Sequence, residues 1–134
     1  MVIGMYINVI GDRRNGKTTA LVKLAVNNVI SDSGSFTVFI TGDTQAGAHV
    51  MSAIRLELLA LGADIERATR DEITLENKSR IKVIAVGSNG RGFSPDYAII
   101  DNIDKMNEDI LFSLRMMLYN TKFIYASSEK QFKL

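Results

Sequence analysis

A short glycine-containing segment near the start of the chain has the residue types and spacing needed to hold phosphate groups. It fits the pattern G-x-x-x-x-G-K-[ST], with glycines at its first and sixth positions and a lysine and a threonine at its end. In such a loop the backbone N–H groups point at phosphate oxygens, the lysine reaches the β- and γ-phosphates, and the hydroxyl can ligate Mg²⁺. The expected nucleotide-binding residues are therefore Gly11, Asp12, Arg13, Arg14, Asn15, Gly16, Lys17, Thr18 and Thr19.

The neighbouring sequence decides whether this match reflects function or chance. A glycine-containing loop can fit the pattern by accident, but a phosphate-binding loop must follow a strand and open a helix. Residues 5–10, MYINVI, form an apolar β-rich run, and residues 17–30 carry apolar side chains at three- to four-residue spacing. The segment therefore lies where a phosphate-binding loop is required, and ATP is the expected ligand.

A second candidate is an aspartate at the end of an apolar run. Residues 97–100, YAII, have the pattern of a buried strand, and Asp101 follows at once. A phosphate-binding fold needs an acidic residue in this place to hold Mg²⁺, directly or through water. The alternative is that Asp101 caps the next helix, a role for which Asp104 is better placed. We therefore assign Asp101 to the metal, together with Thr18.

The residue after Asp101 argues against fast hydrolysis. Many ATPases of this type have a glutamate there, which polarises the attacking water. This chain has Asn102, whose neutral amide can orient water but cannot take its proton. Asp104, Glu108 and Asp109 lie nearby in the sequence, but none occupies the expected position. We therefore expect slow hydrolysis, in which Asn102 orients the water.

Strand and helix patterns alternate along the chain and define the fold class. Such alternation is typical of a three-layer α/β domain with a mostly parallel sheet. Two runs around Asn77, Lys78 and Ser79 alternate apolar with polar residues and predict an antiparallel hairpin, an embellishment on that sheet. The length of 134 residues suits a single domain, 1–134. The predicted strands are residues 5–10, 36–40, 72–77, 80–86, 97–100 and 122–126, and the predicted helices are residues 17–30, 46–61 and 107–118.

Composition narrows the possible functions. The formal net charge is +1, so no bulk basic character indicates nucleic acid. There is no cysteine, which excludes disulfides and thiolate metal sites, and His49 alone offers little for a zinc site or a Ser-His-Asp triad. The apolar runs fall far short of the roughly 20 residues of a membrane span, and no signal peptide is visible. We expect a cytoplasmic protein with no membrane partner.

Three further features resemble one family of molecular motors. The loop reads GDRRNGKT, with an arginine at its third position, and the pair Arg91-Gly92 stands ten residues before Asp101. The last predicted strand continues into Ser127 and Ser128 as FIYASS. Together with the segment TGDTQAGAHV and the hairpin, these features resemble the ATPase domain of phage terminase large subunits, which package DNA into capsids. The resemblance covers nearly the whole chain.

The resemblance implies a P-loop NTPase fold and a role for each matching residue. Arg13 would be an additional phosphate-loop arginine, and Arg91 would complete the site of a neighbouring subunit in a ring. Ser127 and Ser128 would form the motif that couples the state of the γ-phosphate to movement. Simpler roles compete with these, because Arg91 could be solvated, Arg13 and Arg14 could decorate an anion site, and the serines could only end a strand. The implied catalytic residues are Lys17, Asp101, Arg91 and Asn102, with Ser127 at the nucleotide.

Departures from the family pattern leave three functional hypotheses open. Compared with the family pattern, we expect this chain to lack the upstream adenine-contacting segment and the nuclease domain, and Asn102 stands in place of the catalytic glutamate. The first hypothesis is a viral, terminase-like Mg-ATPase that handles double-stranded DNA as a homo-oligomer in the host cytoplasm. The second is a nucleotide-binding regulatory module that hydrolyses poorly and docks onto a larger phage or host protein. The third is a small-molecule kinase, although no arginine-rich lid segment is recognisable.

Overall fold

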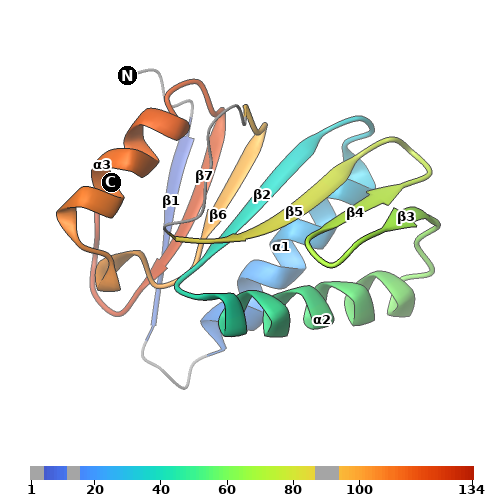
Figure 1. The fold of residues 1–134 in the computed structure, drawn as a ribbon, viewed down its shortest axis with the longest axis horizontal. Helices are drawn as coiled ribbons and strands as arrows, with labels where there is room; N and C mark the ends of the chain where they lie inside the picture. Colours follow the sequence, from blue (N-terminus) through green and yellow to red (C-terminus); the bar gives the residue numbers. More distant parts are fainter. Residues whose placement is uncertain (1–4, 12–15, 87–93) are drawn as a thin grey trace.

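A seven-stranded sheet forms the centre of the molecule in a computed structural model that describes residues 5–11, 16–86 and 94–134. The elements in chain order are β1 (Met5–Ile10), α1 (Lys17–Ser31), β2 (Phe36–Thr41), α2 (Thr44–Ala60), β3 (Ile65–Ala68), β4 (Glu72–Leu75), β5 (Arg80–Ala85), β6 (Tyr97–Ile100), the 3₁₀ helix η1 (Ile103–Lys105), α3 (Glu108–Met117) and β7 (Phe123–Ser128). The strand order is β1-β7-β6-β2-β5-β4-β3. Strands β1, β7, β6, β2 and β5 are parallel, and β4 and β3 continue the sheet antiparallel at the end opposite β1 (Figure 1).

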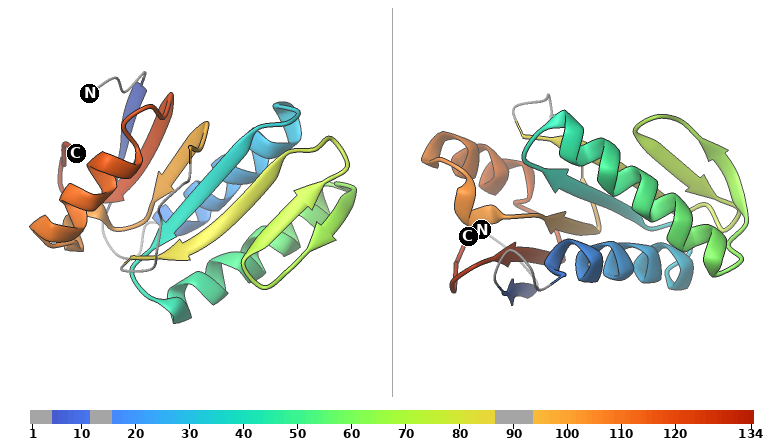
Figure 2. Two further views of the ribbon diagram at one scale, coloured as in Figure 1. Left: turned by 45° about the horizontal axis from the view of Figure 1, so that its top comes forward. Right: turned by 90° about the horizontal axis from the view of Figure 1, so that it is seen from below.

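Helices cover both faces of this sheet, because its central strands are apolar on both sides. β2 is buried along its whole length, and its residues alternate between two cores. Phe39 packs with α1 and α2, whereas Val38 and Ile40 pack with α3. Helices α1 and α2 contact each other (Figure 2), and α3 lies apart from them at the β1 end of the sheet (Figure 1). This is the three-layer α/β architecture that the sequence predicts.

None of the helices within residues 5–11, 16–86 and 94–134 has the length and the apolar character that crossing a bilayer requires.

Most of the predicted elements are confirmed, and two differences have local causes. Helix α2 begins at Thr44 rather than at residue 46, because the Asp43 carboxylate accepts a hydrogen bond from the Ala46 N–H at 2.7 Å and caps the helix. The sequence does not predict β3. Three of its four residues are exposed, so it lacks the apolar alternation that marks a half-buried strand.

The hairpin of β4 and β5 is more central than the sequence indicates. Its antiparallel pairing is confirmed, but β5 also pairs in parallel with β2 along the whole strand, from Arg80 opposite Phe36 to Ala85 opposite Thr41. The hairpin is therefore not an embellishment on a complete sheet. Both of its strands are internal strands of that sheet, because β3 pairs with β4 at the edge.

Two polar side chains anchor the turn of this hairpin to the end of α1: Asn77, and Ser79, whose Oγ donates to the Val29 carbonyl at 2.6 Å. Asn77 Nδ2 donates to the Val29 carbonyl at 2.8 Å, and Asn77 Oδ1 accepts from the Ser79 N–H at 3.0 Å. We expect Asn77→Ala to lower the free energy of unfolding by about 1–2 kcal/mol, because it removes both hydrogen bonds. Chemical denaturation measures this change. Glu76→Ala, at the exposed neighbouring position, should change stability by less than about 0.5 kcal/mol, and equal effects at the two positions would contradict the anchor.

Candidate functional site

The candidate site lies at one edge of the sheet, where parallel strands from distant parts of the chain end together. Gly11 follows β1, Asp101 follows β6, and Ser128 ends β7. Because β7 pairs with both β1 and β6, these three ends are adjacent, at the edge of a parallel sheet where ligands usually bind. A cavity of ≈ 800 Å³ opens there, and the described residues that line it are Gly16, Lys17, Thr18, Thr19, Asn102, Lys105 and Glu129.

The start of α1 forms one wall of the cavity and is suited to an anion. Gly16 precedes the helix with φ +69°, a left-handed conformation that favours glycine, and it has no side chain to cap the first N–H groups. The first turn of the helix contains no acidic residue, so nothing within that turn neutralises the positive end of the helix dipole. Lys17 is 8% exposed, and its Nζ donates to the Gly11 carbonyl at 2.7 Å. The ammonium is therefore held beside the cavity with further donors left for a phosphate.

Asp101 connects α1, β6 and β7 through two hydroxyl groups. It is 7% exposed; its Oδ2 accepts from the Thr18 hydroxyl at 2.9 Å, and its Oδ1 accepts from the Ser127 hydroxyl at 2.8 Å. The Ser127 oxygen in turn accepts from the Asn102 N–H at 2.8 Å. The structure thus brings together four of the residues predicted from the sequence. A continuous chain of hydrogen bonds leads from the first turn of α1 to the backbone after β6.

The contact between Thr18 and Asp101 fits a magnesium ion. A hydroxyl and a carboxylate are hard oxygen ligands of the kind that Mg²⁺ prefers, and this ion usually keeps several waters and takes phosphate oxygens as well. Within the described ranges, no group of three or more His, Cys, Asp or Glu side chains could hold a metal ion. A metal held by Thr18 and Asp101 would take its other ligands from water and from phosphate oxygens.

Asp104 does not cap the following helix, which corrects the prediction made from the sequence. The N-cap of α3 is Asn107, whose Oδ1 accepts from the Ile110 N–H at 2.9 Å. Asp104 lies in η1 instead, and its Oδ2 accepts from the Glu129 N–H at 3.1 Å. It ties the turn after β6 to the end of β7.

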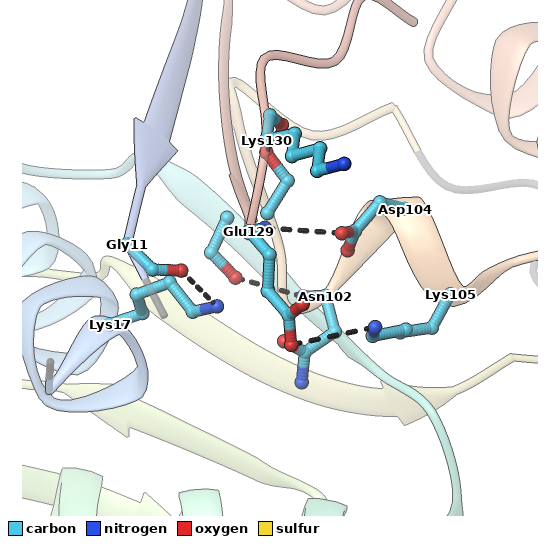
Figure 3. Close-up of polar contacts among 9 residues, drawn as sticks. Gly11, Lys17, Asn102, Asp104, Lys105, Glu129 and Lys130 are labelled. Atoms are coloured by element: carbon cyan, nitrogen blue, oxygen red, sulfur yellow. Dashed lines mark hydrogen bonds and ion pairs between the residues drawn. The ribbon is translucent and has the colours of Figure 1, made fainter. Parts of the chain in front are cut away.

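Two charged residues that the sequence analysis does not single out also line the cavity. Lys105 comes from η1 and Glu129 follows β7, and their side chains form an ion pair with 3.5 Å between Nζ and Oε1. In Figure 3 the Glu129 side chain reaches from the end of β7 towards Asn102 and Lys105. One signal in the sequence could have found Glu129: it directly follows the Ser127-Ser128 pair at the end of the last predicted strand. No comparable signal marks Lys105.

The other residues predicted from the sequence lie in different environments. Thr19 is exposed and lines the cavity. Ser128 is buried; its Oγ accepts from Asn8 Nδ2 at 2.8 Å and donates to the Lys130 carbonyl at 2.6 Å. Of the serine pair, Ser127 is thus the one that bonds to the acidic residue of the site. The predicted residues that lie outside the described part of the chain are Asp12, Arg13, Arg14, Asn15 and Arg91.

The same architecture occurs in solved structures of phage proteins. The HK97 bacteriophage large terminase matches with a TM-score of 0.72 at 18% sequence identity, over 94% of this chain and 29% of that chain. The Thermus phage P74-26 large terminase ATPase domain matches with a TM-score of 0.64 at 17% identity, over 99% and 62% of the two chains. The large terminase from a thermophilic bacteriophage, in complex with ADP, matches with a TM-score of 0.67 at 14% identity, over 93% and 34%. The fold is that of a phage large terminase ATPase domain.

The structural matches cover most of this chain but only part of each matching protein. The chain spans about a third of the HK97 and thermophilic phage large terminases and 62% of the P74-26 chain. No protein-family model and no curated protein matches the sequence. At these identities the likeness concerns the fold, so the activity has to be argued from the site.

Proposed function

We propose that this protein binds Mg-ATP in the cavity and hydrolyses it as a terminase-like ATPase that acts on double-stranded DNA. The observation that carries the proposal is the hydrogen bond between Thr18 and Asp101, residues 83 positions apart in the chain. It supports the proposal because a pair suited to Mg²⁺ meets beside Lys17, which is suited to phosphate, in a terminase-like fold. A large terminase with this fold has been solved with ADP and with ATP-gamma-S, which supports the choice of nucleotide.

Each side chain has a distinct role in this proposal. Lys17 exchanges its carbonyl partner for β- and γ-phosphate oxygens, and the N–H groups at the start of α1 bind the same phosphates. Thr18 and Asp101 would hold Mg²⁺, which would neutralise part of the negative charge on those oxygens. Ser127 donates a hydrogen bond to Asp101 and accepts one from the Asn102 N–H. A movement of the Asp101 carboxylate would therefore also move the turn after β6.

The proposal includes an assembly and a cellular setting. Arg13 would contact phosphate within its own subunit, and Arg91 would reach the nucleotide of a neighbouring subunit, as the resemblance to terminases implies. A homo-oligomer that works on duplex DNA in the cytoplasm of a host cell is the setting that suits this role.

A second function is favoured by Asn102. Its amide lines the cavity but cannot accept a proton from water, which suits a regulatory module that binds ATP and docks onto a larger phage or host protein. ATP turnover with and without duplex DNA, over a range of protein concentrations, separates the two functions. Binding without turnover under all these conditions supports the regulatory module.

Lys17→Ala is expected to weaken Mg-ATP binding at least about tenfold, because it removes an ammonium that faces the β- and γ-phosphates. Isothermal titration calorimetry with Mg-ATP measures the change. Lys23→Ala is the matched control, since Lys23 is an exposed lysine of the same helix and should be replaceable without effect. Wild-type affinity in the Lys17→Ala protein would contradict the proposed site.

A further inference from the structure

Glu129 is the one carboxylate among the described residues that line the cavity. Two residues of η1 contact Glu129, one at its main chain and the other at its side chain. The Glu129 N–H donates to Asp104 Oδ2 at 3.1 Å, and Glu129 Oε1 lies 3.5 Å from Lys105 Nζ (Figure 3). The side chain is 34% exposed, so its carboxylate is accessible to water in the cavity.

The other acidic residues near the site are engaged elsewhere. Both oxygens of Asp101 accept hydrogen bonds from hydroxyl groups, and Asp104 accepts one from the Glu129 backbone. Glu108 lies on α3 outside the cavity lining, and its carboxylate pairs at 3.9 Å with an arginine of the same helix. Asn102 lines the cavity, but its amide cannot take a proton. Within the described ranges, Glu129 is thus the acid placed to meet a water in the cavity.

The position of Glu129 follows from the neighbouring strands. β6 and β7 pair in parallel, so both strand ends meet at the same cavity. Ser127 contacts Asp101, and Glu129 lies two residues further on, in the segment directly after β7. A carboxylate can therefore reach the cavity from the end of β7, although an asparagine follows Asp101 at the end of β6.

We propose that Glu129 is the catalytic residue that takes a proton from the water attacking the γ-phosphate, and that Lys105 is the positioning residue for its carboxylate. This inference rests on the proposed ATPase function. The water oxygen forms a bond to the γ-phosphorus while the bond from that phosphorus to the β–γ bridging oxygen breaks, and ADP leaves with the electron pair. One water proton passes to the Glu129 carboxylate and then to solvent, so ATP and water yield ADP, phosphate and a proton.

Glu129→Gln is expected to lower kcat at least about 100-fold, because a general base contributes roughly 10²–10⁴ in rate. Its affinity for Mg-ATP should stay within about threefold of wild type, since the proton transfer belongs to the transition state. Steady-state turnover and calorimetric titration measure the two quantities. Glu108→Gln is the matched control: it also removes an ion-paired carboxylate, but outside the cavity, and should leave kcat unchanged.

Two further measurements distinguish a base from a structural ion pair. Lys105→Ala should lower kcat about tenfold at unchanged KM, because the carboxylate loses its orientation. Lys105→Arg keeps the charge and should recover most of that loss.

The possible outcomes separate this inference from the proposed function. Wild-type kcat in Glu129→Gln overturns the role of Glu129 and leaves the ATPase function standing. Equal losses of kcat and Mg-ATP affinity in Glu129→Gln also overturn it, because they indicate a structural role. A wild-type protein that binds Mg-ATP without turnover overturns it in favour of the regulatory module. A wild-type protein that does not bind Mg-ATP overturns the proposed function itself.

Discussion

Asp101→Asn is expected to lower ATP turnover by about 10³-fold while the protein stays folded. The substitution keeps the shape of the side chain, and the amide oxygen can still accept the hydrogen bond from Ser127. It removes the negative charge that a metal ion requires at this position. Loss of about 4 kcal/mol of charge stabilisation corresponds to this factor, because each 1.36 kcal/mol is tenfold in rate. Steady-state turnover at varied Mg²⁺ concentration measures the effect.

A control and a second readout separate the metal from the fold. Asp64→Asn removes the same charge from the exposed turn between α2 and β3, and it should leave turnover unchanged. The Tm of Asp101→Asn without nucleotide should match that of wild type, whereas the rise in Tm on adding Mg-ATP should shrink, because a ligand stabilises only the state that binds it. Turnover above about a tenth of the wild-type rate would refute the assignment of Asp101 to the metal.

Short segments are sufficient to predict the part of the site formed by the start of α1 and the end of β6, because its residues are determined by their immediate neighbours. Lys17 opens a helix after a glycine, and Asp101 follows a buried strand. Parallel strands of such a sheet end at one edge, so their meeting there is expected from the order of the elements. The hydrogen bonds from Thr18 and from Ser127 to the Asp101 carboxylate agree with that expectation.

The rest of the site depends on contacts between elements that no local pattern records. Lys105 and Glu129 meet because η1 lies against the end of β7, and neither residue belongs to a motif. Asp104 stands near a helix in the sequence, but η1 intervenes and Asn107 occupies the cap. The pairing of the strands is also only partly predictable from the sequence. The alternating pattern of β5 indicates an antiparallel partner, but it does not reveal the parallel pairing with β2.

Arg91→Ala is expected to lower turnover by about 10³–10⁵-fold, as the loss of an arginine that acts on a transferring phosphoryl group does. Two lysines, Lys17 and Lys105, are the cations among the described residues that line the cavity, and no arginine is among them. A lysine is a point charge, whereas the fork of an arginine places two N–H donors on the charge that develops in the transition state. Arg91→Lys should therefore fail nearly as badly, with little change in Mg-ATP affinity.

Mixing two inactive variants tests whether Arg91 acts on a neighbouring subunit. Arg91→Ala keeps an intact phosphate-binding lysine, and Lys17→Ala keeps an intact arginine. A subunit of the first kind becomes active when its neighbour is of the second kind. Random mixing in equal amounts creates this arrangement at about a quarter of the interfaces, so up to about a quarter of wild-type turnover should return, rising with protein concentration. If no mixture recovers activity at any concentration, Arg91 does not act between subunits. Wild-type turnover in the Arg91→Ala protein alone would show that Arg91 is a solvated residue with no role in hydrolysis.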